Sequence, residues 1–248
     1  MNLPARITRA ALAAVAISAF AFAISITIPG SPPATCVETG CFCEAASGGI
    51  PQQWAATFSS LAFAVLGVWA ILTPVQPSKE RTLVPLAGIA MIFIGVSSYV
   101  YHASLTFLGQ FLDIYAMYTL GLLLLFGALW RSGTLSGRAS IALFVVLSLV
   151  LGVAQYLYPD ARRVLFALLL LPGIVLEFLP WVTRGTTKRW LIAGVATMAG
   201  AYIIWILDQV PALCDPQGWW QGHAAWHVLG AVAAILLTKH YRSTAHEL

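Results

Sequence analysis

The chain has 248 residues, of which 60% are hydrophobic and only 9% are charged. Soluble domains carry about 25% charged residues, so this composition excludes an ordinary soluble domain and indicates a polytopic membrane protein. The net charge of +4 comes from cations spread over several loops and tails. Because they form no basic patch, a nucleic-acid partner is not expected.

Apolar runs of about 20 residues, the length that crosses a bilayer, recur along the chain. Pro172-Gly173 interrupts the sixth of them and predicts a kink. The expected fold class is all-α: a polytopic bundle with a seven-helix core and one extra N-terminal hydrophobic helix. The eight predicted runs are 8–29, 54–75, 84–103, 107–130, 139–158, 163–183, 189–208 and 222–238.

Arg6 and Arg9 precede the first run, as cations do in a signal peptide. The run is long for a signal and ends without a clear A-x-A site, which favours a retained anchor. Both alternatives export the segment that follows. The predicted parts are an anchor helix or uncleaved signal (1–29), an exported loop (30–50), a seven-helix membrane domain (51–240) and a cytoplasmic tail (241–248).

Lys and Arg predict the orientation, because cytoplasmic loops carry an excess of them. With the N-terminus inside, all 13 Lys and Arg residues are cytoplasmic except Arg162 and Arg163. This asymmetry predicts an even number of spans with both termini cytoplasmic, in a bacterial inner membrane or a eukaryotic endomembrane. His240 and His246 follow the last run and are expected to be solvated on the cytoplasmic side.

The four cysteines all fall in exterior loops of this topology. Cys36, Cys41 and Cys43 lie in the exported loop, and Cys214 lies in the loop before the last run. An even set in one oxidising compartment predicts disulfides. Zinc binding by the cysteines is the alternative, but no C-x-x-C pair supports it.

Ionisable residues gather at one depth in three of the runs. The third run ends at the outer face with Ser98 and His102. The fourth returns from that face with Asp113, and the last begins there with His223 and His227. Ionisable groups inside a membrane are costly and usually mark a functional site. The topology therefore predicts that these side chains converge near the outer face.

Three imidazoles and a carboxylate suit a zinc site that keeps one position open for water. Such a site lowers the pKa of the water to about 7. Asp113 can accept the proton, and Ser98 can orient the water or stabilise an oxyanion. The set predicts hydrolysis of a carbonyl compound at a membrane surface, although each residue alone is also compatible with a helix–helix hydrogen bond.

Two further acids have no assigned role. Glu177 lies deep in the sixth run, in its inner half, where it can pair with a polar group or a water. Asp208 ends the seventh run at the outer face near Cys214, and a structural contact is favoured there over catalysis.

The order of these motifs resembles the alkaline ceramidase family, which is related to adiponectin-receptor-like proteins. That family carries G-x-x-S-x-x-x-H-x-T/S-L, then Q-x-L-D-x-x-x-M, W-x-x-D and H-x-x-W-H. The resemblance covers about residues 41–240. The matching segments are Gly95-Val-Ser-Ser98-Tyr-Val-Tyr-His102-Ala-Ser-Leu, Gln110-Phe-Leu-Asp113-Ile-Tyr-Ala-Met117, Trp205-Ile-Leu-Asp208 and His223-Ala-Ala-Trp226-His227.

The resemblance implies a seven-helix bundle with a catalytic zinc ion on His102, His223 and His227. It further implies that Asp113 holds and deprotonates the water and that Ser98 assists at the metal or the oxyanion. The implied reaction cleaves the amide of a ceramide into a sphingoid base and a fatty acid. The extra first helix departs from the family.

The exported loop departs further from the family, which carries a calcium motif of the type D-W-C-E-x-N followed by E-F-W-N. Of its acidic ligands only Glu44 remains here. Calcium needs several oxygen ligands, so no calcium site is expected. The family's disulfide between this loop and the late exterior loop implies a Cys43–Cys214 bridge, which leaves Cys36 and Cys41 for a possible second bridge.

The leading hypothesis is a zinc-dependent amidase that acts on a membrane lipid. A lipid acyl-ester hydrolase on the same zinc core is one alternative. A non-enzymatic receptor or transporter is another, but a conduction path would need polar groups in both leaflets, and the inner half offers little beyond Glu177. The sequence leaves the chain-length preference and the oligomeric state open.

Overall fold

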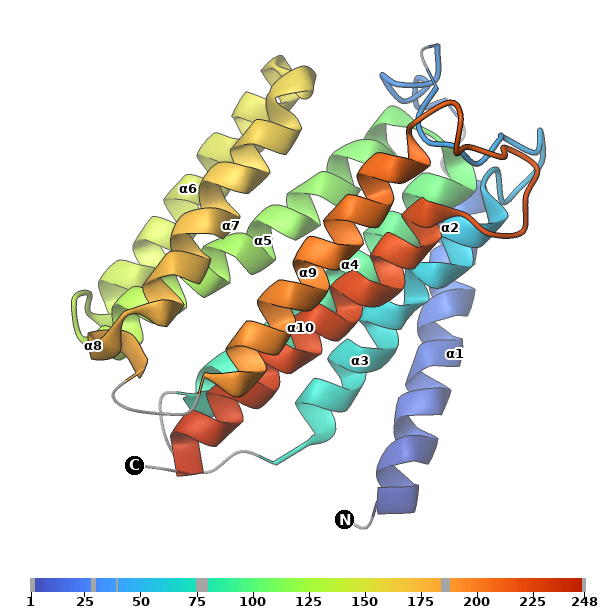
Figure 1. Ribbon diagram of the computed structural model, residues 1–248. Helices are drawn as coiled ribbons and strands as arrows, with labels where there is room; N and C mark the ends of the chain where they lie inside the picture. The colour runs from blue at the N-terminus through green and yellow to red at the C-terminus, as the bar shows by residue number, and fades with distance from the viewer. Residues whose placement is uncertain (1–2, 28–29, 39, 75–79, 184–187, 247–248) are drawn as a thin grey trace.

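The computed structural model describes residues 3–27, 30–38, 40–74, 80–183 and 188–246 (Figure 1). Within these residues the long segments are all helical, and the only β-type pairing is an isolated bridge between Pro33 and Thr106. The predicted all-α class is confirmed. The helices are α1 (Leu3–Thr27), α2 (Trp54–Ser59), α3 (Leu61–Leu72), α4 (Glu80–Ser104), α5 (Phe107–Ser132), α6 (Gly137–Leu157), η1 (Pro159–Ala161, a 3₁₀ turn), α7 (Arg162–Phe178), α8 (Pro180–Thr183), α9 (Arg189–Asp208) and α10 (Gly222–His246).

Five helical segments of the described residues are long and apolar enough to cross a membrane. α1 contributes a shorter apolar stretch, Val15–Ile24. α7 continues through Pro172 and ends at Phe178, after which Leu179 is extended and Pro180 opens α8. The sixth predicted run is thus divided into two helices. The five spans are Trp54–Leu72, Arg81–Ser104, Phe107–Ser132, Gly137–Leu157 and Arg189–Asp208.

The long segments alternate in direction along the chain. The start of α1 and the end of α10 lie at one end of the bundle, here named the tail end, and the loops 30–53 and 209–221 lie at the other, the loop end (Figure 1). This arrangement is consistent with the predicted even number of crossings. It also places the last turns of α4 and the first turns of α5 and α10 at the loop end.

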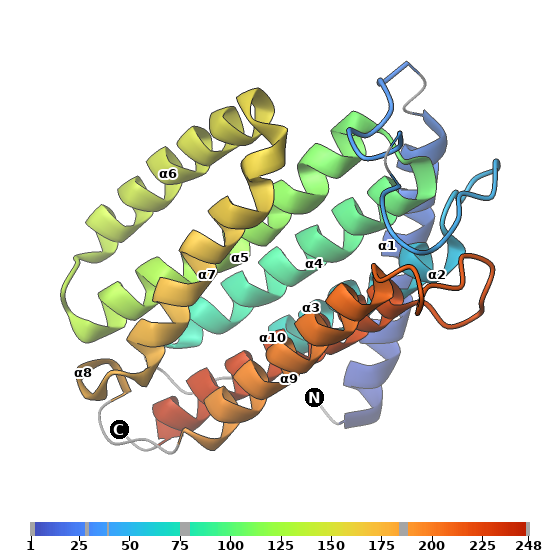
Figure 2. The ribbon, with the colours of Figure 1, turned by 45° about the horizontal axis from the view of Figure 1, so that its top comes forward.

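α4 is central in the packing. α3, α5, α10 and α1 all contact it, α6 and α7 pack against α5, and α9 packs against α10 (Figure 2). α3 and α4 approach backbone to backbone, because a Cβ atom on Gly67 would lie 2.5 Å from the carbonyl oxygen of Gly88. Small residues allow such close contact between membrane helices. The segment before α3 is thereby held at a fixed place beside α4.

A buried polar cluster, here named the tail-end cluster, joins α5, α7 and α10. Arg131 forms an ion pair with Glu177, and the hydroxyl of Tyr241 donates to Glu177 Oε1 at 3.0 Å. His240 Nε2 lies 3.8 Å from Glu177 Oε2. All four side chains are buried. Glu177, which the sequence left without a role, therefore pairs with groups from two other helices.

This cluster corrects two predictions. His240 is not solvated but fully buried, because α10 continues past residue 238 to His246 and keeps packing against the bundle. The tail end, which the sequence predicts to be the inner half, also holds more polar groups than Glu177. The expected lack of polar groups there therefore does not argue against a conduction path. The side chain of His246 lies outside the described part of the chain.

Candidate metal centre

Three imidazoles meet at the loop end of the bundle. His102 comes from the last turn of α4, and His223 and His227 come from the first turns of α10, where their i, i+4 spacing puts them on one face. One ring nitrogen of each lies within 4.8 Å of the other two. The rings are buried, with exposed fractions of 0%, 6% and 4%. The structure thus brings together the three histidines that the sequence singled out.

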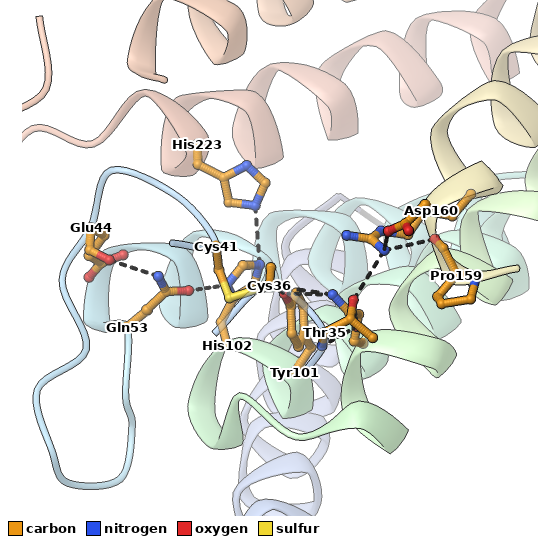
Figure 3. Close-up of a disulfide and its surroundings, with 12 residues drawn as sticks. Thr35, Cys36, Cys41, Glu44, Gln53, Tyr101, His102, Pro159, Asp160 and His223 are labelled. Atoms are coloured by element: carbon orange, nitrogen blue, oxygen red, sulfur yellow. Dashed lines mark hydrogen bonds and ion pairs between the residues drawn. A yellow bond between two sulfur atoms is a disulfide. The ribbon is translucent and has the colours of Figure 1, made fainter. Parts of the chain in front are cut away.

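The spacing of the ring nitrogens fits a metal ion. His223 Nε2 lies 3.2 Å from His102 Nε2 (Figure 3). Two neutral imidazoles repel when their lone pairs face each other, so a proton or a cation must stand between them. A tetrahedral site with metal–nitrogen bonds of 2.0–2.1 Å has nitrogen–nitrogen edges of about 3.3 Å. The observed separation is therefore close to that of a tetrahedral site.

The loop before α2 fixes the ring of His102. His102 Nδ1 lies 2.8 Å from Gln53 Oε1, and the amide nitrogen of Gln53 donates to the carbonyl oxygen of Glu44 at 2.8 Å (Figure 3). Because the amide already donates elsewhere, its oxygen must accept from His102. Nδ1 of His102 therefore carries the proton, and Nε2 keeps its lone pair for a metal.

α2 fixes the ring of His227 in the same way. His227 Nδ1 lies 3.1 Å from the carbonyl oxygen of Ala56 and 2.9 Å from the hydroxyl of Ser59. The carbonyl can only accept, so Nδ1 donates to it and Nε2 faces the centre. Both rings thus have the tautomer that a metal ligand needs.

Ser98 connects the histidines to Asp113. Its hydroxyl lies 3.3 Å from His227 Nε2 and is close enough to Asp113 to interact with its carboxylate. Asp113 is 8% exposed and stands in the second turn of α5. Within the described residues, the group of mutually close ligand atoms comprises the histidines alone. Asp113 is therefore placed beside the candidate metal centre rather than in it.

Two disulfides hold the loop 30–53, one within it and one to the loop before α10. Cys36 is bonded to Cys41, and Cys43 is bonded to Cys214 in the loop before α10. These are the pairs that the family resemblance suggested. No cysteine among the described residues is free, so the cysteines offer no separate metal site.

Two carboxylates at the loop end cap the N-termini of helices. The oxygens of Glu44 accept from the backbone N–H groups of Ala55 and Ala56 at 2.7 and 2.9 Å, which caps α2. Asp208 Oδ1 accepts from the N–H of Gly222 at 2.6 Å and so caps α10. Asp208 makes the structural contact that the sequence favoured, on the helix that carries two of the histidines.

Sequence reasoning missed Gln53 and Ala56 as partners of the imidazoles. Gln53 is separated from His102 by 49 residues, and Ala56 acts through its backbone. Motif spacing carries no signal for either contact. The only weak signal in the sequence for Gln53 is that a polar residue directly precedes an apolar run.

Comparison with known proteins agrees with this geometry. A model of the family Ceramidase matches residues 50–247, a range that contains the candidate metal centre and leaves out most of the loop 30–50. No curated protein matches the chain. Because the match extends over most of the sequence, the chain belongs to the ceramidase family.

Proposed function

We propose that this protein is a zinc-dependent amidase that hydrolyses ceramide-like lipids to a sphingoid base and a free fatty acid. Membership of the ceramidase family implies a hydrolase that acts on an amide bond of a lipid. The observation that carries the metal assignment is the close approach of three buried imidazoles with their Nε2 atoms turned inward.

The donor set favours zinc, because imidazoles in a tetrahedral arrangement with one open position are typical of catalytic zinc sites. When bound, zinc supplies Lewis acidity and lowers the pKa of a water to about 7. Gln53 and Ala56 keep the proton of two ligands on Nδ1. Because both hydrogen bonds lie within the protein, they set these tautomers whether or not a lipid is bound.

Asp113 is the proposed general base and acid. It accepts a proton from the attacking water and returns it to the amide nitrogen as the carbon–nitrogen bond breaks. Ser98, whose hydroxyl lies 3.3 Å from His227 Nε2, is proposed to orient this carboxylate. The same hydroxyl is placed to stabilise negative charge on the carbonyl oxygen.

The lipid is proposed to enter sideways from the bilayer. α6 and α7 pack on α5, whereas α9 packs on α10 (Figure 2). At the loop end, the guanidinium of Arg163 in α7 lies 4.7 Å from the ring of Trp205 in α9. We propose that the acyl chains pass between α7 and α9, on the side of this contact that faces the tail end.

The test is hydrolysis by purified protein in lipid nanodiscs that contain ceramide and phosphatidylcholine together. We expect sphingoid base and fatty acid in equal amounts from ceramide with the wild type, and a loss of both products with Asp113→Asn. Fatty acid released only from phosphatidylcholine would refute the amidase and support the ester hydrolase. Release from neither lipid, by protein that holds no metal, would refute a hydrolase altogether.

A further inference from the structure

His223 differs from the other two imidazoles. Nδ1 of His102 and Nδ1 of His227 each hydrogen-bond to the protein. Nδ1 of His223 is buried and has no hydrogen-bond partner among the described residues. A metal-bound imidazole usually gives its second N–H to a group that fixes the ring, so another contact must orient His223.

That contact is with Phe42 in the exported loop. The two rings stack with centroids 3.7 Å apart and planes 18° apart. Phe42 also lies against the ring of His102, at 5.1 Å between centroids, and against Tyr101 at 6.2 Å. A stacked ring restricts rotation of its neighbour and shields it from water.

The backbone of Phe42 is fastened on both sides. Its preceding neighbour Cys41 is bonded to Cys36 (Figure 3). Its following neighbour Cys43 is bonded to Cys214. Cys214 belongs to the loop that leads into α10, the helix of His223. The segment that carries Phe42 is thus covalently joined to the chain just before the helix that it contacts.

We propose that Phe42 is a positioning residue of the metal centre. The two disulfides fix the backbone on both sides of Phe42, and its ring orients the imidazole of His223 by stacking. Hydrogen bonds to Nδ1 orient the other two imidazoles. The intact disulfides thereby raise the metal affinity of the centre. This inference rests on the proposed function, because it requires that the three histidines bind a metal.

The test measures Zn²⁺ affinity by competition with a chelating dye, and ligand geometry from the visible spectrum of Co²⁺-loaded protein. Loss of a group that orients a metal ligand lowers metal affinity by about 10–100-fold. We expect that loss and an altered Co²⁺ spectrum for Phe42→Leu, which keeps apolar bulk without a ring face. Phe42→Tyr, which keeps the ring, should retain wild-type affinity.

The matched control is Phe58→Leu. Phe58 is an aromatic residue at the same end whose ring packs against Trp54 and Tyr99. Its replacement should leave Zn²⁺ affinity and the Co²⁺ spectrum unchanged. An equal loss in this control would mean that any aromatic residue of the loop end matters, which overturns a specific role for Phe42.

The Cys36→Ser/Cys41→Ser variant tests the clamp separately, since it keeps Phe42 and frees one side of it. We expect a smaller loss of Zn²⁺ affinity in the same direction, and this variant decides the matter if Phe42→Leu does not fold. If Phe42→Leu or Cys36→Ser/Cys41→Ser folds and keeps the wild-type Zn²⁺ affinity and Co²⁺ spectrum, the inference is overturned. The proposed function would then be unaffected. A wild type that binds no Zn²⁺ would instead overturn the proposed function.

Discussion

The two buried polar clusters of this protein are opposites. At the tail end, Arg131 and Glu177 carry opposite charges and pair with each other, with Tyr241 completing the contact. At the loop end, His102 and His223 turn equivalent nitrogens toward each other at 3.2 Å. The first cluster neutralises itself, whereas the second needs a proton or a cation between the two nitrogens. An ionisable residue inside a membrane protein therefore marks a ligand site when its neighbours leave it uncompensated, and marks a structural contact when they compensate it.

Removing two of the imidazoles should give the largest difference in zinc binding between the two clusters. In His223→Ala/His227→Ala we expect bound zinc to fall from about one per chain to none, because one remaining imidazole cannot hold the ion. Hydrolysis should become undetectable. Elemental analysis of purified protein checks this, with Glu177→Gln as the control that keeps its zinc. Zinc retained by the histidine variant would contradict the site.

Asp113→Asn tests whether the rate of hydrolysis can be lowered at the loop end without loss of bound zinc. Loss of a general acid–base group lowers the rate by about 10²–10⁴-fold, and we expect this fall in kcat with zinc content unchanged. Single-turnover hydrolysis of a fluorescent ceramide, alongside elemental analysis, measures both. If the variant lost its zinc in proportion to its activity, Asp113 would be a ligand and not a base.

Glu177→Gln should affect folding but not the site. It leaves Arg131 buried without its carboxylate, and breaking a buried pair costs about 3–5 kcal/mol. The free energy of unfolding in detergent should fall by that amount, while zinc binding persists in the protein that remains folded. Arg131→Met/Glu177→Leu removes both charges and should recover most of the loss. A loss of zinc in folded Glu177→Gln protein would show that the two clusters are coupled.

The smallest expected effect comes from Gln53→Ala, which removes the acceptor of His102 Nδ1. Zinc affinity should fall by about 10–100-fold, with the other two ligands in place. Gln53→Glu keeps an acceptor at this position and should bind more tightly than Gln53→Ala. Equal affinities for the wild type and Gln53→Ala would mean that the amide does not orient the ring.

The fold followed from hydropathy because long apolar runs have few structural options in a membrane. The convergence of the histidines followed from topology, since alternating spans return to the same face. Hydropathy failed at the end of α10, where the helix continues through less apolar residues and buries His240. It also failed at Leu179, where one apolar run contains two helices.

The partners of the imidazoles were beyond sequence reasoning for a different reason. Gln53 and Phe42 come from an irregular segment, which has no periodicity to indicate where a side chain points. Their contacts join residues far apart in the chain. The disulfides, the cap on α2 and the backbone hydrogen bond from Gln53 to the carbonyl oxygen of His102 bring them to the histidines.

The bare contact between Gly67 and Gly88 has a consequence for the chemistry. α3 follows the segment that supplies Gln53 and Ala56, and α4 carries His102. The distance between α3 and α4 therefore affects how far the hydrogen-bond acceptors lie from the imidazole rings. A single methyl group introduced at Gly67 or Gly88, away from the three histidines, would push the two helices apart. The geometry of the candidate metal centre thus depends on the absence of side chains at Gly67 and Gly88.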